Sequence, residues 1–138
     1  MRISSSKLAF LIAGVAALQG AAGVTLAAAA AHVDSNPLLS TASQFLTVHA
    51  AAGLGLAALV RTTPRQEAHW LAVIALALQA GVTLFAGDLT ARVVLTGKLF
   101  PFAAPIGGVL TIVSWCALAV WAAFAMLRAN SLQTPPES

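Results

Sequence analysis

The stretch GVTLFAGDLTARVV, residues 81–94, places two charged side chains at the end of a long apolar run. Asp88 and Arg92 stand four residues apart, so they share one face of an α-helix, with the acid N-terminal to the base. Pairing lowers the cost of removing each charge from water. We predict a structural ion pair that ends a membrane span. A substrate or proton site at the same place is the alternative, because ionisable groups within membranes are often functional.

The composition of the whole chain agrees with a membrane environment. Of its 138 residues, 59% are hydrophobic and 8% are charged, and the mean hydropathy is +0.90. A surface this apolar does not suit an ordinary soluble domain. The formal net charge is +3, but the seven basic residues are scattered along the chain, which argues against a nucleic-acid-binding surface. The single cysteine, Cys116, lies in an apolar run and is expected to act as a small hydrophobic residue. The first expected partner is therefore the lipid bilayer.

The apolar residues fall into four runs separated by short polar links, at residues 8–31, 45–60, 70–91 and 103–127. The first run holds 24 residues without a charge, which as a helix extend about 36 Å against a hydrocarbon core of about 30 Å. The second run holds 16 residues and needs extension at its ends or shielding by its neighbours. The sequence therefore predicts an all-α fold, an integral membrane four-helix bundle. It forms a single transmembrane domain over residues 1–138, with a polar C-terminal tail at 129–138.

Two of the links carry local signals. The stretch HVDSNPLLSTASQ, residues 32–44, is typical of a turn followed by a short interfacial helix that enters the second span. The stretch LTGKLFPFAAP, residues 95–105, mixes Gly, Lys and Pro with large apolar side chains, which suits a loop at the level of the lipid headgroups.

Basic residues indicate the orientation of the bundle. In a four-span arrangement five fall on one side and two on the other: Arg2, Lys7, Arg61, Arg65 and Arg128 against Arg92 and Lys98. Because cytoplasmic loops carry an excess of Lys and Arg, we expect both termini in the cytoplasm.

The basic start and Ala-rich continuation of residues 1–31 also fit a cleaved signal peptide. A retained first helix is preferred because the apolar run exceeds a usual signal core.

Small residues indicate where helices pack closely. In the first span they recur at steps of three and four, at Ala13, Ala16, Gly20, Gly23, Ala27 and Ala30. Such a stripe lets another helix approach, either within the bundle or from a foreign subunit. Gly87, Pro105, Gly107 and Gly108 are further helix-packing candidates, since glycines at the start of the fourth span allow a tight entry and close contact.

Two histidines are the remaining polar candidates. His32 ends the first span and His49 lies early in the second, so we expect the two to approach each other near the external face. A metal or haem site is a weak alternative, because no Cys/His cluster with metal-ligand spacing accompanies them. The chain also lacks phosphate-binding loops, dinucleotide fingerprints and nucleophile motifs. We therefore predict no catalytic residue, no metal and no cofactor.

The stretch LFAGDLTARVVLTGKLFPFAAPIGGVLTIVSW, residues 84–115, resembles the signature of the YgdD-like small membrane proteins, domain of unknown function family 423, which has a mitochondrial membrane counterpart in animals. The resemblance extends back to AAAAAH, ending in His32, and to FLTVHA, residues 45–50. An Ala run replaces the usual Gly-Ala pair before the first His, and Phe45 stands where a Tyr is common. The family-defining positions on this resemblance are Phe85, Gly87, Asp88, Arg92, Gly97, Pro101, Pro105, Gly107, Gly108 and Trp115, with His32 and His49 before them. The resemblance implies a small multi-pass protein of the bacterial inner membrane with no established reaction.

Two classes of function follow. The first is a non-catalytic accessory subunit or assembly factor, whose first helix and APIGG turn dock on a larger membrane complex, such as a respiratory or photosynthetic one. The alternative is a small oligomeric transporter or channel with a polar path around Asp88, Arg92 and His49. If Asp88 and Arg92 form only a structural pair, exchanging the two residues should recover much of the stability that Asp88→Asn loses.

Overall fold

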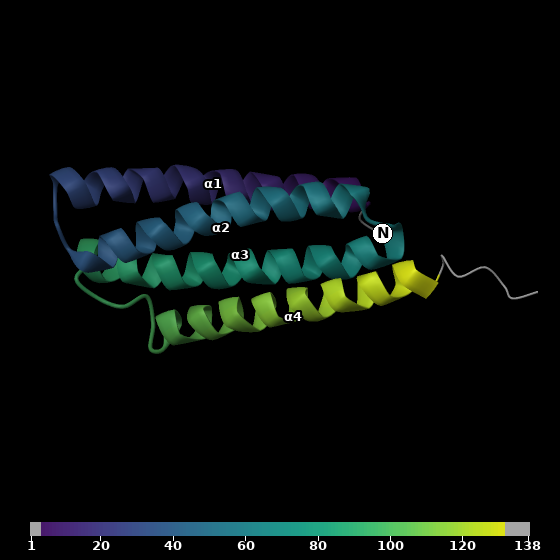
Figure 1. The fold of residues 1–138 in the computed structure, drawn as a ribbon. Coiled ribbons are helices and arrows are strands. Elements are labelled where there is room, and N and C mark those ends of the chain that lie inside the picture. Colours follow the sequence, from purple (N-terminus) through teal and green to yellow (C-terminus); the bar gives the residue numbers. More distant parts are fainter. Residues whose placement is uncertain (1–3, 132–138) are drawn as a thin grey trace, which may run out of the picture.

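The computed structural model describes residues 4–131, with side chains described for residues 4–128. This part of the chain forms four α-helices and no strand, which confirms the predicted all-helical fold. The helices are α1 (Ser5–His32), α2 (Pro37–Thr62), α3 (Arg65–Val94) and α4 (Ala103–Ser131). They run alternately up and down, each beside the next (Figure 1). Arg2 and residues 132–138, which make up most of the predicted polar tail, lie outside the described residues.

Local signals set where the first two helices begin. The hydroxyl of Ser4 accepts a hydrogen bond from the backbone N–H of Lys7, which caps α1. The side chain of Asn36 accepts one from the backbone N–H of Leu38, and Pro37 occupies the first turn of α2. The predicted short interfacial helix is therefore the first part of α2 itself. This extension gives α2 26 residues, about 39 Å, so the second span is long enough to cross a membrane.

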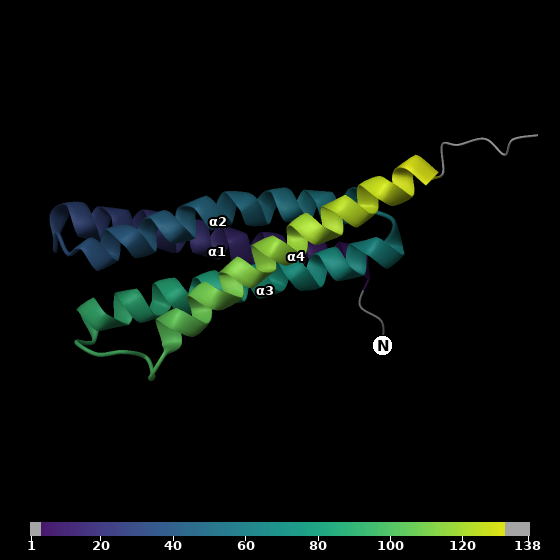
Figure 2. The same ribbon diagram turned by 60° about the horizontal axis from the view of Figure 1, so that its bottom comes forward.

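The two clusters of buried core residues come from α1, α2 and α3, and α4 packs Leu118 and Trp121 against the larger one. The larger of two core clusters includes Ile12, Val60 and Leu71, and the smaller one includes Ala42 and Val82. The backbone of α4 packs against α3 and, within the described residues, does not come close to α1 or α2. Figure 2 shows α4 crossing the bundle obliquely. As a result 11% of the apolar span of α4 is buried inside the bundle, against 44% for α2 and for α3.

The bundle has two distinct ends. The start of α1, the link between α2 and α3, and the last turn of α4 lie at one end, here called the terminal end (Figure 1). The α1–α2 link and the loop of residues 95–102 lie at the other, here called the loop end (Figure 1). Each helix is long and apolar enough to cross a membrane. The architecture is that of a helical bundle with four potential membrane spans.

Candidate functional site

The Asp88–Arg92 pair lies near the end of α3. The Arg92 Nε and Nη2 atoms donate hydrogen bonds to Asp88 Oδ2 at 2.9 and 2.5 Å. The side chain of Asp88 is fully buried, whereas that of Arg92 is 31% exposed. The acid is thus held inside the protein while the base reaches outward, as expected for a charge pair close to the end of a membrane span.

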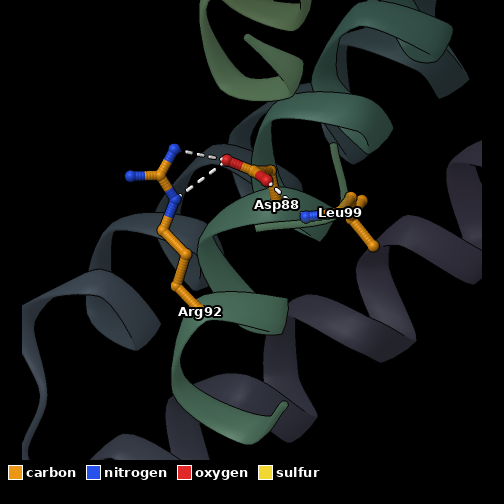
Figure 3. A network of polar contacts seen from close by, with 3 residues as sticks. All are labelled: Asp88, Arg92 and Leu99. Atoms are coloured by element: carbon orange, nitrogen blue, oxygen red, sulfur yellow. Dashed lines mark hydrogen bonds and ion pairs between the residues drawn. The ribbon is translucent and has the colours of Figure 1, made fainter. Parts of the chain in front are cut away.

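Asp88 has a second partner that spacing alone did not indicate. The backbone N–H of Leu99, in the loop of residues 95–102, donates to Asp88 Oδ1 at 2.9 Å. Figure 3 shows Arg92 and Leu99 reaching the carboxylate from opposite sides. Both carboxylate oxygens are therefore occupied, and Asp88 ties the loop to α3. An exchange of the two charged residues would bury an arginine and leave the Leu99 N–H without its acceptor. The structure thus argues against the rescue that a simple ion pair predicts.

The loop of residues 95–102 has an unusual backbone. Thr96 and Phe102 both have positive φ angles, 56° and 68°, which bulky residues rarely adopt. Thr96 adopts the left-handed conformation that commonly ends a helix. Glycine is the usual residue in this conformation, but here the neighbouring Gly97 does not adopt it. The loop exposes Leu99, Phe100 and Phe102. The depth of this loop at the level of the lipid headgroups stays a prediction.

His49 belongs to an aromatic cluster between α2, α3 and α4. Its Nδ1 lies 2.7 Å from the carbonyl oxygen of Phe45, and its Nε2 accepts a hydrogen bond from the Trp115 indole at 3.3 Å. Because a carbonyl can only accept, these two bonds fit a neutral imidazole protonated on Nδ1. The rings of Phe45 and Phe85 pack together, with centroids 4.5 Å apart. Both nitrogens of His49 are engaged, and the residue bridges helices.

The expected approach of His32 and His49 is wrong. His32 is exposed at the end of α1, whereas His49 is buried about 18 Å along α2 from Pro37. The reason is the early start of α2, which places His49 three turns inside the helix instead of at its entry. Within residues 4–128, no group of three His, Cys, Asp or Glu side chains is arranged to hold a metal ion.

Ala16, Gly20 and Gly23 of the small-residue stripe on α1 face α2. A Cβ atom on Gly23 would come within 3.2 Å of the Ser43 carbonyl oxygen, and one on Gly20 would contact Ala50. The Ser43 hydroxyl donates to the Gly23 carbonyl oxygen at 2.7 Å across the same contact. The part of the stripe at Gly20 and Gly23 is thus occupied by the bundle's own second helix, whereas Ala27 of the same stripe is exposed.

Gly81 and Gly107 meet where α4 crosses α3. A Cβ atom on Gly107 would lie 2.7 Å from the Gly81 carbonyl oxygen, closer than real side chains come, and one on Gly81 would lie 2.9 Å from the Gly107 carbonyl oxygen. Gly108 has space for a side chain, and a Cβ on Gly87 would make an ordinary contact with Leu99. Pro105 is exposed in the first turn of α4, where a missing N–H is tolerated. Of the two adjacent glycines, Gly107 is the one that the close approach requires.

Polar side chains in the bundle interior bond either across helices or within their own helix. Gln19 Nε2 donates to the Gln79 carbonyl oxygen and to the Thr83 hydroxyl, both at 3.0 Å, and so joins α1 to α3. Thr111 and Ser114 instead bond within their own helix, because each donates to a carbonyl oxygen four residues earlier in α4. The hydroxyl of a helical Thr or Ser finds that acceptor without a second helix.

A cavity of about 700 Å³ opens between α1 and α3 toward the loop end. Apolar side chains dominate its lining, including Val15, Leu26 and Leu46, and Gln19 and three threonines contribute polar atoms. Asp88, Arg92 and His49 are not among the lining residues. The cavity therefore does not join the three polar candidates into one path.

Together these features define a polytopic helical-bundle protein of the membrane, in which charged and aromatic side chains fasten helices to one another. A family model matches residues 19–108, a range that includes His49, Asp88 and Gly107. The chain belongs to this family, described as the protein of unknown function family DUF423, which confirms the resemblance noted from the sequence. Most of α4 lies beyond the match. No curated protein and no solved structure matches the chain.

Proposed function

We propose that this protein is a non-catalytic accessory subunit or assembly factor of a larger membrane complex in the bacterial inner membrane. The observation that carries the proposal is the small buried share of α4 beside the well-packed α2 and α3. A helix in lipid gains stability chiefly by close packing, and α4 packs closely against one neighbour. Its outward face is available to a transmembrane helix of the partner.

The outward face of α4 is shaped by large apolar side chains. Val109, Ile112, Val113 and Val120 are each more than half exposed. Branched side chains have few rotamers, so they lose little freedom when a second helix packs on them. We propose α4 in place of α1 as the docking surface, because α2 already covers Gly20 and Gly23 of α1.

The contacts of the polar residues favour this function over transport. Both oxygens of Asp88 and both nitrogens of His49 are engaged in hydrogen bonds within the chain. A transported ion or proton would have to displace a buried partner at each of them, which is costly in a site of low dielectric. An anchoring role uses the same bonds without breaking them.

The partner can be located with a photo-reactive amino acid placed at Val113, on the outward face of α4. In native membranes we expect an adduct of one defined mass. The matched control is the same group at Leu11 of α1, since Leu11 is 53% exposed and Val113 is 56% exposed. Leu11 should give no protein adduct. A mass equal to two copies of this chain would show a homo-oligomer, and lipid adducts alone at Val113 would contradict the proposal.

The proposed orientation places the terminal end in the cytoplasm. Within the described residues that end carries Lys7, Arg61, Arg65 and Arg128, while Arg92 and Lys98 lie toward the loop end. We expect a membrane-impermeant thiol reagent added to intact spheroplasts to label Ser35→Cys and not Thr63→Cys, both in a Cys116→Ser background. Labelling of Thr63→Cys alone would reverse the orientation.

A further inference from the structure

A second cavity lies at the terminal end, between the start of α3 and the end of α4. Its volume is about 270 Å³, and it is lined by Glu67, Trp70, Trp121, Phe124, Ala125 and Arg128. It therefore combines three aromatic rings with one acidic and one basic side chain. None of these residues takes part in the Asp88 or His49 contacts described above.

The two charged groups of this cavity already lie close together. Arg128 Nη1 donates a hydrogen bond to Glu67 Oε1 at 3.1 Å. The side chain of Glu67 is 25% exposed and that of Arg128 is 66% exposed, so both can also meet a molecule at the surface. A guanidinium has five N–H donors and can hold a carboxylate and a phosphate oxygen together. The pair thus offers a negative and a positive group side by side.

The aromatic rings add recognition of a cation. Trp70 and Phe124 are 64% and 61% exposed, and Trp121 is partly buried against the helix core. Aromatic faces attract ammonium groups, and a neighbouring carboxylate accepts hydrogen bonds from a primary ammonium but not from a quaternary one. Tryptophans at helix ends also lie typically at the level of lipid headgroups.

From this arrangement we infer that the Glu67–Arg128 cavity binds the headgroup of a zwitterionic phospholipid, with phosphatidylethanolamine preferred. The ammonium lies against the aromatic rings and donates to Glu67, while Arg128 faces the phosphate. Glu67 repels headgroups that carry only negative charge, which sets the order phosphatidylethanolamine, phosphatidylcholine, phosphatidylglycerol. The inference requires the helices to cross a membrane and does not depend on any protein partner.

Native mass spectrometry of the delipidated protein with equimolar amounts of the three lipids tests this order. We expect about tenfold tighter binding of phosphatidylethanolamine than of phosphatidylglycerol, with phosphatidylcholine between them. Soluble phosphoethanolamine at the same concentration should not displace the lipid, because it lacks the acyl chains. Equal binding of the three lipids would overturn the inference, and displacement by phosphoethanolamine would assign the cavity to a soluble ligand.

Two variants locate the binding in this cavity. Trp70→Leu should reduce phosphatidylethanolamine binding several-fold, whereas Phe10→Leu should not, although Phe10 has the same 64% exposure. Phe10 is a suitable control because its ring meets the Arg61 guanidinium and lies outside the cavity. Glu67→Gln should reduce the preference for phosphatidylethanolamine over phosphatidylcholine. Equal losses in Trp70→Leu and Phe10→Leu would place the lipid elsewhere, and circular dichroism checks that each variant is folded.

Discussion

Gly107→Ala is expected to destabilise the packing of α4 on α3, whereas Gly108→Ala is expected to leave it intact. A methyl group on Gly107 would meet the Gly81 carbonyl oxygen and the backbone of Phe85, and neither can move without shifting a helix. Overpacking of this kind costs about 1–3 kcal/mol. On Gly108 the nearest atom is Phe85 Cδ2 at 3.9 Å, and alanine there improves helix propensity by up to about 1 kcal/mol.

The measurement is equilibrium unfolding of the two variants in mixed detergent micelles, followed by tryptophan fluorescence. Two of the three tryptophans, Trp115 and Trp121, lie on α4 and the third, Trp70, lies on α3, so the signal reports on the two helices whose packing is disturbed. Because the two glycines are adjacent, differences in depth or in local sequence cannot explain a difference in stability. Equal stabilities would show that the α3–α4 crossing is not set by Gly107.

Asp88→Ala is expected to lower the free energy of unfolding by about 3–5 kcal/mol, the largest effect of any variant considered. The substitution leaves the Arg92 guanidinium without its acid and the Leu99 N–H without its acceptor. Asp88→Asn should cost less, since its side-chain oxygen can still accept from Leu99. The same unfolding measurement checks both variants.

Glu67→Gln is the control for the loss of an ion pair. The Glu67–Arg128 pair lies at the surface, with Arg128 66% and Glu67 25% exposed, so its loss should cost less than about 1 kcal/mol. The double variant Asp88→Arg/Arg92→Asp should remain as unstable as Asp88→Ala, because no carboxylate would face the loop. Recovery of stability in this exchange would show that the contact with Leu99 contributes little.

Much of the fold could be predicted from the sequence, because membrane spans are encoded by length and apolar composition. The four runs led to four helices, and a spacing of four put Asp88 and Arg92 on one face, where their side chains pair. The start of α2 was less accessible. Residues 37–44 are polar enough to look like a separate interfacial helix, yet the Asn36 cap begins a helix that continues unbroken through Thr62.

The missed contacts depend on groups that have no sequence signal of their own. The second partner of Asp88 is a backbone N–H, which every residue but proline carries, so Leu99 could not be singled out. Gly23 of α1 packs against α2, and Gly107 of α4 packs against α3, and these contacts depend on which helices are neighbours. The sequence indicated the small-residue stripe that includes Gly20 and Gly23, but it did not indicate that α2 is the helix packed against these two glycines. The cavity between Trp70 and Trp121 joins the start of α3 to the end of α4, residues far apart in the sequence, and follows only from the fold.

The bond between Asp88 and Leu99 also bears on the order of events as the chain is made. The acceptor precedes its donor by 11 residues, so the loop contact can form only after Leu99 has been synthesised. Arg92 arrives seven residues earlier and can pair with Asp88 within a single newly formed helical turn. The local pair thus protects the carboxylate while the hairpin is incomplete, and the later bond fixes the finished hairpin in place.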